Sequence, residues 1–577
     1  QAKLLAREVL KGYGPSDEFQ VQPTGSFHLN DRFQLQDEAL EQVNEIDYHN
    51  NNFHFGELVR NLELLFTEAR NSGRVVYFLS DFQTTTVLKD SLAQGDRPEG
   101  MRLHFIPIGS RTPPNAYVSG TGFKNAIIQQ GKPLTMELAL NNDGEEVLDD
   151  LRLRVQVAGE EVSIGSEEAL RPGQRKLTEV TFTPKHGGWN AGKVLLDDPQ
   201  VDFDTSRYFS FYIPQDQRIL LVDGAARTEY LNLVFDSLLT NFRLKRIDAQ
   251  QLANERLGRY SMIVLGGAQD VSSGMRDKLG EWVRGGGGLV FFPGSDMNVQ
   301  AVNKLYHRLG LGQFQEPMVT EDPPIQLAEP NLSHLLFEGV FEETDQQSEF
   351  DSPSISQLYR FQPSTTGGQI QQTLLEDQNG RAILHDGRVG EGRVLSFALA
   401  PDLDWSDWPL KSSFVPILYR ATLILNNVAN QDLSQTIGSP ELYKLKDAGE
   451  GRVKLVDAQG NAFYPEQYNR AGQLVLKFDQ MGLQPGTYTL RQQDSVLGKL
   501  AFNLPDEESI LNVHTPEELS AALAERGLTQ ETTTPARPEV LRAEVQASEM
   551  GIPLWKYFLV AAALMFIAEV AIVKLLR

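Results

Sequence analysis

The sequence predicts a multidomain protein that combines α/β domains with β domains and ends in a transmembrane helix. Its 577 residues exceed what one hydrophobic core supports, so roughly three to five domains are expected. Two stretches alternate apolar strand runs with helical patterns, which is typical of α/β folds. Two other stretches carry short strands between turn residues, which is typical of small β domains. The chain closes in a long apolar run.

The first two predicted domains differ in their hydrophobic pattern. Residues 1–111 hold the helical pattern FHFGELVRNLELLFTEARNSG and the apolar strands RVVYFLSDFQ and MRLHFIPIGS, so an α/β domain is expected. Residues 112–215 change to alternating strands such as LTMELALNN, each followed by turn residues. This pattern predicts an Ig-like β-sandwich.

The α/β pattern returns over residues 216–430, where YSMIVLGG, GGLVFFPG and EGRVLSFALA have the composition of buried strands. Buried strands separated by helical patterns predict a doubly wound sheet. Residues 431–506 are expected to form a second small β domain. In residues 507–551 a capping box begins a helix at Thr515, and the polar run TQETTTPARPEV is expected to be a linker.

Charge and composition exclude several functions. The chain has 77 acidic and 53 basic residues and a formal charge of -24, so its surface repels phosphate backbones. No nucleic-acid partner is therefore expected. The chain contains no cysteine, which removes disulfides, thiolate metal sites and cysteine nucleophiles together.

Residues 552–577 hold the run PLWKYFLVAAALMFIAEVAIVKLLR. Roughly 20 mainly apolar residues suffice to cross the bilayer core as a helix. Trp555 and Tyr557 stand at one border of the run, and Lys574 and Arg577 stand at the other. Aromatic residues are typical of membrane interfaces and basic residues of the cytoplasmic side. The pattern predicts a membrane anchor that leaves the preceding residues outside the cytoplasm.

Glu569 interrupts this apolar run. A carboxylate that faces lipid is costly, so its side chain either reaches the nearby interface or pairs with a polar group of another helix. Small residues let helices approach closely, and Ala561, Ala562, Ala563 and Ala568 lie in the same run. The sequence therefore favours pairing of Glu569 with a partner protein inside the membrane.

Three residues mark the expected carboxyl edge of the doubly wound sheet, where such sheets bind ligands. Gly267 ends the strand YSMIVLGG, Ser295 follows GGLVFFPG at a strand-to-helix break, and Asp402 follows EGRVLSFALA. They are the candidate lining of a ligand pocket. A serine at such a break has the position of a nucleophile, but it needs a base within hydrogen-bond reach.

The sequence does not supply that base. The later strand leads to Asp402 and holds no histidine, and His385 stands beside an expected hairpin turn. A partly exposed turn histidine is a commoner interpretation there than a catalytic one. No catalytic residue is therefore predicted. The run Gly285–Gly288 lacks the lysine of a phosphate loop and precedes a strand, which favours a helix end.

Asp81 is the one metal candidate. It ends the strand VVYFLSD, where a carboxylate can hold Mg²⁺ or Ca²⁺. One carboxylate does not complete a site. No cofactor is predicted, except that Mg²⁺ or Ca²⁺ is expected if residues that precede Gln1 complete the site.

These segments together resemble the BatA-like membrane proteins of bacterial aerotolerance (Bat) operons, in their long form. YFLSDFQ and HFIPIGS resemble the later strands of a von Willebrand factor A domain. ILLVDG, IVLGGAQD, GGLVFFPGSD and DLDWSDWPL resemble a class I amidotransferase-like domain, and LWKYFLVAAALMFIAEVAIV is similar to the last membrane helix of the family. Family members begin with two membrane helices and a serine-bearing strand, so the resemblance implies an A domain that is N-terminally truncated here.

The resemblance also bears on catalysis and on partners. Class I amidotransferases carry a cysteine at the strand-to-helix break and a His-x-Glu on a later strand. The matching places here hold Gly294–Ser295 and Ala400–Asp402, so both catalytic positions are replaced. The resemblance implies other Bat-type von Willebrand A proteins and a cytoplasmic MoxR-type AAA+ ATPase as partners. It also implies the bacterial inner membrane, with the main part of the chain in the periplasm.

We therefore expect a non-enzymatic, membrane-anchored envelope scaffold that binds partner proteins. The alternative is a small-ligand receptor or a hydrolase that uses the strand-end pocket near Gly267, Ser295 and Asp402. A serine-reactive probe that labels the chain, or a bound small molecule, would favour the alternative.

Overall fold

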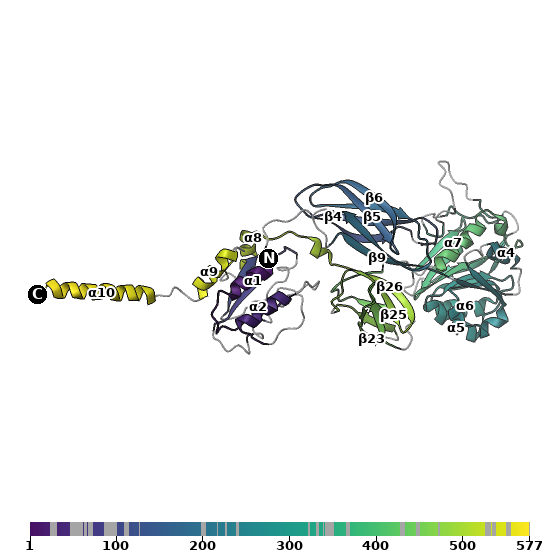
Figure 1. Cartoon of the computed structure of the whole chain (residues 1–577). Helices are drawn as coiled ribbons and strands as arrows, with labels where there is room; N and C mark the ends of the chain where they lie inside the picture. Colours follow the sequence, from purple (N-terminus) through teal and green to yellow (C-terminus); the bar gives the residue numbers. More distant parts are fainter. Residues whose placement is uncertain are drawn as a thin grey trace.

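The computed structural model shows a mixed α/β protein rich in β-sheet, and its described strands form six sheets (Figure 1). The structure describes residues 1–577 without 24–31, 47–61, 63–65, 67–72, 86–100, 109–114, 126, 198–203, 216, 225–227, 238–241, 321–323, 331–333, 338–339, 341–350, 365–369, 427–432, 446–450, 471–472, 480, 526–531, 534–537, 550–554 and 576–577. The sheets group into four packing units. The boundaries of the predicted domains stay predictions.

The first unit, here called the base, combines the two ends of the chain. Its sheet has the order β1-β2-β27, and all three strands run parallel. The base comprises α1 (Ala2–Leu10), α2 (Gln36–Glu45), β1 (Val75–Ser80), β2 (Arg102–Pro107), α8 (Pro516–Glu525), β27 (Thr532–Thr533) and α9 (Pro538–Glu549). Both strands expected in residues 1–111 are therefore present. The helix expected over residues 53–73 lies almost wholly outside the described residues.

The side chains of β2 alternate between the two faces of the sheet, and this explains why the base needs both chain ends. Successive side chains of a strand point to opposite faces. Leu103 and Phe105 are buried on the face that also holds Leu519 of α8. Ile106 is buried on the other face, together with Leu541 of α9. The segment that the sequence assigned to a helix and a linker thus covers both faces of β2.

The second unit, here called the sandwich, consists of two antiparallel sheets. One sheet has the order β3-β4-β7 and the other the order β6-β5-β8-β9. Their inward side chains form one apolar core, as the alternating pattern predicts. The strands are β3 (Ala116–Phe123), β4 (Leu134–Asn142), β5 (Leu148–Val157), β6 (Glu160–Leu170), β7 (Gln174–Phe182), β8 (Gly188–Asp197) and β9 (Ser206–Ile213).

The third unit, here called the α/β unit, is built on a sheet of nine strands in the order β11-β10-β12-β13-β18-β17-β15-β14, with β16 beside β17. The strands from β11 to β18 in this order run parallel, and the remaining pairs are antiparallel. The strands are β10 (Arg218–Asp223), β11 (Arg243–Asp248), β12 (Met262–Ala268), β13 (Gly288–Pro293), β14 (Gly312–Val319), β15 (Gln357–Pro363), β16 (Gln371–Glu376), β17 (Ala382–Val389) and β18 (Gly392–Phe397).

Helices cover both faces of this sheet. In Figure 1, α5 and α6 lie on one face, and α4 and α7 lie on the other. The helices are α4 (Glu229–Ser237), η2 (Ala249–Asn254), η3 (Leu257–Arg259), α5 (Ser273–Arg284), α6 (Val299–Leu309), η4 (Trp408–Leu410) and α7 (Phe414–Asn426). Gly285 follows the last residue of α5, and β13 starts at Gly288. The glycine run is therefore a helix end before a strand, as predicted.

The fourth unit, here called the small β unit, docks on the sandwich. Its sheets have the orders β19-β26-β25-β21-β22 and β20-β24-β23. The side chain of Asn503 accepts the N–H of Tyr208 at 2.7 Å and donates to its carbonyl at 2.9 Å, which ties the two units together. The elements are β19 (Ser434–Thr436), β20 (Leu442–Leu445), β21 (Val453–Val456), β22 (Ala462–Phe463), β23 (Glu466–Arg470), β24 (Gln473–Lys477), β25 (Gly486–Gln492), β26 (Ser495–Asn503) and η5 (Asp506–Ser509).

The last element is the apolar helix α10 (Trp555–Leu575). Its residues Trp555–Ile572 are long and apolar enough to cross a membrane, and none of this window is buried inside the protein. Figure 1 shows α10 leaving the molecule beyond α9, on the side of the base.

Candidate functional site

The break after β13 is a strand-to-helix elbow, as the sequence predicts. β13 ends at Pro293, and α6 begins at Val299. Ser295 is exposed in the turn between them. Asn298 caps the helix, because its side-chain oxygen accepts the N–H of Ala301 at 3.1 Å.

Glycines bring this elbow close to the end of β12. The N–H of Gly294 donates to the carbonyl of Ala268 at 3.0 Å. A Cβ added to Gly294 would lie 2.7 Å from the carbonyl oxygen of Gly267, so only glycine fits there. Gly267 itself has a φ of 62°, a conformation that residues with a Cβ rarely adopt. The structure thus places Gly267 beside the elbow of Ser295.

Tyr359, which the sequence analysis did not single out, holds the elbow in place. Its side chain is buried, and its hydroxyl accepts the N–H of Met297 at 3.2 Å. The same hydroxyl lies 3.0 Å from the carbonyl oxygen of Gly294 and 3.2 Å from that of Ser295, and it can donate its one proton to either. The hydroxyl of Tyr359 therefore contacts three backbone groups of the elbow. Nothing in the spacing of SISQLYRFQP marks this tyrosine.

Tyr359 also connects the elbow to the turn that carries Asp402. Its ring stacks on Trp405, with the centroids 5.1 Å apart. The backbone N–H of Trp405 donates to the carbonyl of Asp402 at 3.1 Å. The carboxylate of Asp402 accepts the N–H of Asp404 at 2.9 Å. Asp402 thus shapes a turn, and the aromatic pair lies between this turn and the elbow.

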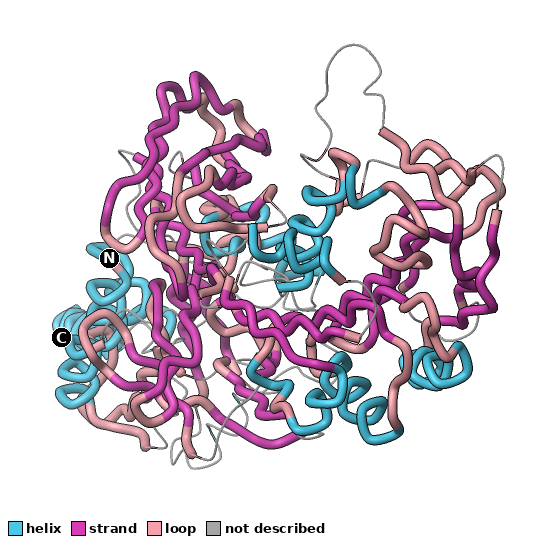
Figure 2. Tube along the Cα trace, turned by 90° about the vertical axis from the view of Figure 1, so that its right-hand side faces the viewer, coloured by secondary structure: helices cyan, strands magenta, loops and turns pink. Residues whose placement is uncertain are grey.

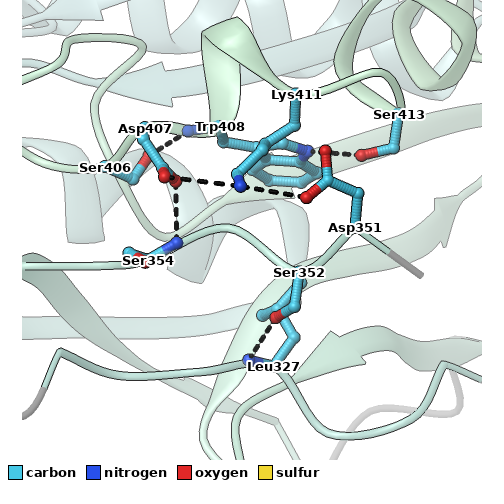
Figure 3. A network of polar contacts seen from close by, with 9 residues as sticks. All are labelled: Leu327, Asp351, Ser352, Ser354, Ser406, Asp407, Trp408, Lys411 and Ser413. Atoms are coloured by element: carbon cyan, nitrogen blue, oxygen red, sulfur yellow. Dashed lines mark hydrogen bonds and ion pairs between the residues drawn. The ribbon is translucent and has the colours of Figure 1, made fainter. Parts of the chain in front are cut away.

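The chain after this turn is held by a polar network (Figure 3). Asp407 accepts the N–H of Ser354 at 2.7 Å. Lys411 lies 2.9 Å from a carboxylate oxygen of Asp351 and 3.5 Å from one of Asp407. These charged groups are paired with one another, and exposed ion pairs of this kind contribute at most about 1 kcal/mol each.

The position of His385 differs from the prediction. It is buried inside β17, with 2% of its surface exposed, and the hairpin turn lies later, at Gly390. Its Nε2 lies 3.2 Å from the amide oxygen of Gln371. Burial lowers the pKa of His385 to about 4, so the ring is neutral at neutral pH.

His385 also lies too far from the elbow to serve as its base. The strand register aligns His385 with Ser396 and Ser396 with Phe291. Two strand spacings of about 4.8 Å, and the step from Phe291 to Pro293 at about 3.3 Å per residue, separate the histidine from the strand end by about 12 Å. A general base needs hydrogen-bond contact. His385 therefore cannot activate Ser295.

A buried ion pair lies at the opposite end of β13. Asp386 is 7% exposed and accepts hydrogen bonds from Arg393 Nε at 2.7 Å and Nη2 at 2.5 Å. Burial raises the pKa of Asp386, but hydrogen bonds from Arg393 and His334 outweigh burial and bring the pKa below its usual value. The register aligns Arg393 with Gly288, at the amino end of β13. This charged cluster is therefore remote from the elbow.

A small hollow of about 20 Å³ opens at the carboxyl ends of β10 and β12. Its lining includes Val222, Gly224, Leu252, Leu265, Asp270 and Met275. Gly267, Ser295 and Asp402 are not part of this lining. The three candidate pocket residues are thus neighbours through Tyr359 and Trp405, and they do not surround this hollow.

Asp81 follows β1 and is exposed. The hydroxyl of Ser80 donates to its carboxylate at 3.3 Å. Burial raises the pKa of Glu508, and the negative charges of Asp81 and Glu507 raise it further, so carboxyl groups of η5 lie near Asp81. In the part of the chain that the structure describes, no group of three or more His, Cys, Asp or Glu side chains could hold a metal ion.

No protein-family model and no curated protein matches the chain. A cytoplasmic protein of Salmonella typhimurium LT2 is 15% identical over 37% of this chain and 100% of its own, with a TM-score of 0.28. A ThuA-like protein of Bacteroides uniformis is 13% identical over 37% of this chain and 91% of its own, with a TM-score of 0.28. The CARDB domain of a Pyrococcus furiosus protein is 16% identical over 18% of this chain and 94% of its own, with a TM-score of 0.16. At these TM-scores the likenesses establish neither fold nor function.

Proposed function

We propose that this protein is a non-enzymatic scaffold, anchored in the bacterial inner membrane with its main part in the periplasm, that binds partner proteins. The observation that carries the proposal is the exposure of α10 over the whole window Trp555–Ile572. At 1.5 Å per residue its 18 residues span about 27 Å, close to the bilayer core of about 30 Å. An apolar helix of this length is costly in water, and a bilayer removes that cost.

The orientation rests on the residues that border α10. Trp555 and Tyr557 begin the helix, and Lys574 lies near its end. Basic residues favour the cytoplasmic side of a membrane. The four packing units, which all precede α10, then lie on the periplasmic side.

The geometry of the elbow supports a role without catalysis. Ser295 has the position of a nucleophile, but His385 is about 12 Å from the strand end by the spacing of the strands. The hydroxyl of Tyr359 accepts the N–H of Met297 and lies beside the carbonyl of Gly294, so it stabilises the backbone of the elbow. A serine without a base is a weak nucleophile.

The proposal extends to the family that the sequence resembles. The parallel pair β1-β2 supports a partial von Willebrand A-type domain in the base, and the paired antiparallel sheets support an Ig-like sandwich. The parallel strands and the elbow of the α/β unit support an amidotransferase-like domain. A BatA-like protein with these parts binds other Bat-type von Willebrand A proteins and a MoxR-type AAA+ ATPase.

One observation favours a second candidate, a small-ligand receptor. The hollow at the ends of β10 and β12 lies where doubly wound sheets bind ligands. Its volume of about 20 Å³ has room for about one water molecule, far below that of ligand pockets, which measure about 300–1,000 Å³. We therefore rank this function second.

Affinity capture tests the scaffold. The full chain is expressed in its bacterial membrane, extracted in mild detergent and captured, and the bound proteins are identified by mass spectrometry. We expect a MoxR-type ATPase and membrane proteins with von Willebrand A domains. Recovery of the chain alone, at the same yield from cross-linked and untreated cells, would contradict the proposal.

A serine-reactive probe tests the absence of catalysis. The wild-type chain and Ser295→Ala are treated with a fluorophosphonate, and labelled peptides are sought. We expect labelling of neither, and a stability change within about 0.5 kcal/mol for the substitution, because the hydroxyl is exposed in a turn. Labelling of Ser295 that the substitution abolishes would favour the hydrolase.

A further inference from the structure

The helix that precedes the membrane helix packs on the first helix of the chain. Leu541 and Val545 of α9 are buried in one cluster with Leu5 of α1 and Ile106 of β2. Gly12 permits this approach, because a Cβ at Gly12 would lie 2.6 Å from Cγ1 of Val545. The contact joins residues that are more than 500 positions apart in the sequence.

The preceding helix covers the other face of the same sheet. Leu519 and Leu523 of α8 are fully or almost fully buried, in a cluster with Leu103 and Phe105 of β2. Between the two helices, β27 extends the sheet by pairing with β2. The segment therefore crosses one face, joins the edge and returns over the opposite face.

A backbone contact fastens the start of this segment. The N–H of Thr84 donates to the carbonyl of Asn512 at 2.8 Å, and the N–H of His514 donates to the carbonyl of Phe82 at 3.2 Å. These bonds form an antiparallel pairing just after β1. The base thus holds the segment at its entry, at the sheet edge and at its last helix.

We propose that the described parts of residues 512–549, which include α8, β27 and α9, form a clasp that fastens the base directly to the membrane helix, so that the base lies at the bilayer surface and the later units extend from it as an arm. The inference rests on the proposed membrane anchoring. From Glu549 to Trp555 the chain can reach at most about 20 Å, at about 3.5 Å per residue. The start of the membrane helix is therefore tethered close to the base.

The arrangement of the units agrees with such an arm. In Figure 1 the base lies between α10 and the remaining units, and α5 and α6 lie at the far end of the molecule. In Figure 2, which is turned by 90°, both chain ends lie on the left-hand side of the view. Because the clasp covers Leu103, Phe105 and Ile106 of β2, the base cannot leave the membrane helix without exposing its own core.

The absence of cysteine makes a direct test practical, because a single introduced cysteine takes a single label. Ala2→Cys lies on α1 of the base and Gln300→Cys on α6 of the arm, and both positions are exposed. Each full-length variant carries a fluorophore and is reconstituted into phosphatidylcholine vesicles that contain a lipid quencher at the headgroup. We expect quenching at residue 2 to be several-fold stronger than at residue 300.

A pair of further variants identifies the clasp as the cause. Leu541→Ser combined with Val545→Ser is expected to lower quenching at residue 2 to the level of residue 300. Val540→Ser is the matched control, because Val540 is on the same helix but 46% exposed, and it should leave the quenching unchanged. If the double variant does not fold, the difference in quenching between residue 2 and residue 300 in the otherwise unchanged chain still tests the clasp.

The outcomes separate this inference from the membrane anchoring. Equal quenching at both labels, in a chain that is bound to vesicles, overturns the clasp and leaves the anchor intact. Failure of the chain to associate with vesicles contradicts the anchor itself. Strong quenching at residue 2 in the double variant would also overturn the clasp.

Discussion

The hydroxyl of Tyr359 lies where three backbone groups of the elbow meet. It accepts one N–H, from Met297, and it lies within hydrogen-bond distance of the carbonyls of Gly294 and Ser295. A buried backbone group that loses its partner costs about 1–3 kcal/mol. The turn that carries Ser295 is therefore fixed by a side chain from a strand that follows it by more than 60 residues.

Removing this hydroxyl is expected to loosen the elbow. Tyr359→Phe keeps the ring stacked on Trp405 and leaves the N–H of Met297 with only its second bond, to the carbonyl of Gly294 at 3.2 Å, so its amide should exchange faster, by up to about tenfold, which corresponds to about 1.4 kcal/mol. Hydrogen-exchange mass spectrometry of the peptide over residues 294–299 measures this. Tyr464→Phe, at a position that is 56% exposed, is the control. Unchanged exchange in Tyr359→Phe would show that the hydroxyl does not hold the turn.

Burial of His385 predicts that the α/β unit loses stability in acid. The pKa is about 4 in the folded protein and 6.5 in the unfolded chain, so the unfolded chain binds more protons between these values. The free energy of unfolding is highest above pH 6.5 and falls as the pH drops towards 4, by about 3 kcal/mol at most. Unfolding followed by tryptophan fluorescence reports mainly this unit, because Trp282, Trp405 and Trp408 of the five tryptophans belong to it.

His385→Gln should flatten this dependence, because glutamine does not titrate. The comparison is between unfolding midpoints of the wild-type chain and the variant at pH 7 and pH 5. An equal loss of stability in both proteins would assign the acid sensitivity to other groups. The contribution of Asp386 to acid sensitivity can be distinguished from that of His385, because the lowered pKa of Asp386 places its effect on stability at lower pH.

The sequence located some of these residues and missed others for a physical reason. Gly267 and Ser295 were found because strand ends and breaks leave local signals, and the structure places them side by side. Tyr359 and the burial of His385 were missed, because both depend on strand pairs that are distant in sequence. The spacing of residues along one strand does not determine which strand pairs with it.

At the scale of elements, α10 is the one that the sequence defines most sharply. Its predicted run and its observed bounds, Trp555–Leu575, agree, because length and apolar composition alone determine such a helix. Glu569 is an acidic residue within this apolar helix, and it is exposed. A carboxylate in the apolar run needs a polar partner or access to the interface.

Substitution of Glu569 distinguishes these two explanations. We expect Glu569→Leu to release a membrane partner, while Glu569→Gln, which still forms hydrogen bonds, retains much of it. Partner recovery after detergent extraction and affinity capture measures this, with Ala571→Leu as a control for added bulk in the same helix. Partner recovery that neither substitution of Glu569 changes would indicate that the side chain reaches the interface instead.

The element that the sequence described least well is the run after α8. TQETTTPARPEV was expected to be a linker, yet Thr532–Thr533 pair with β2 as β27. A strand of two residues has no periodicity, and its polar composition hides it. The structure shows that pairing partners, rather than composition, determine this element.

At the scale of the whole molecule, the architecture depends on contacts between the two ends of the chain. The alternation of α/β and β patterns predicted a mixed, sheet-rich chain, and the six sheets agree with it. The docking of residues 512–549 on the base has no local signature, because Leu519, Leu541 and Val545 would look the same in any amphipathic helix. Where these residues pack is known only from the structure, in which β2 provides the complementary apolar surface.

We propose that this protein is anchored by α10 with its folded units outside the cytoplasm. The chain lacks cysteine, so Gln300→Cys and Leu575→Cys each provide one reactive thiol, on α6 and at the end of α10, and Lys574 is kept. Intact spheroplasts are treated with a membrane-impermeant maleimide before and after permeabilisation. We predict that residue 300 is labelled in intact spheroplasts and residue 575 only after permeabilisation. Labelling of residue 300 only after permeabilisation would rule out this orientation.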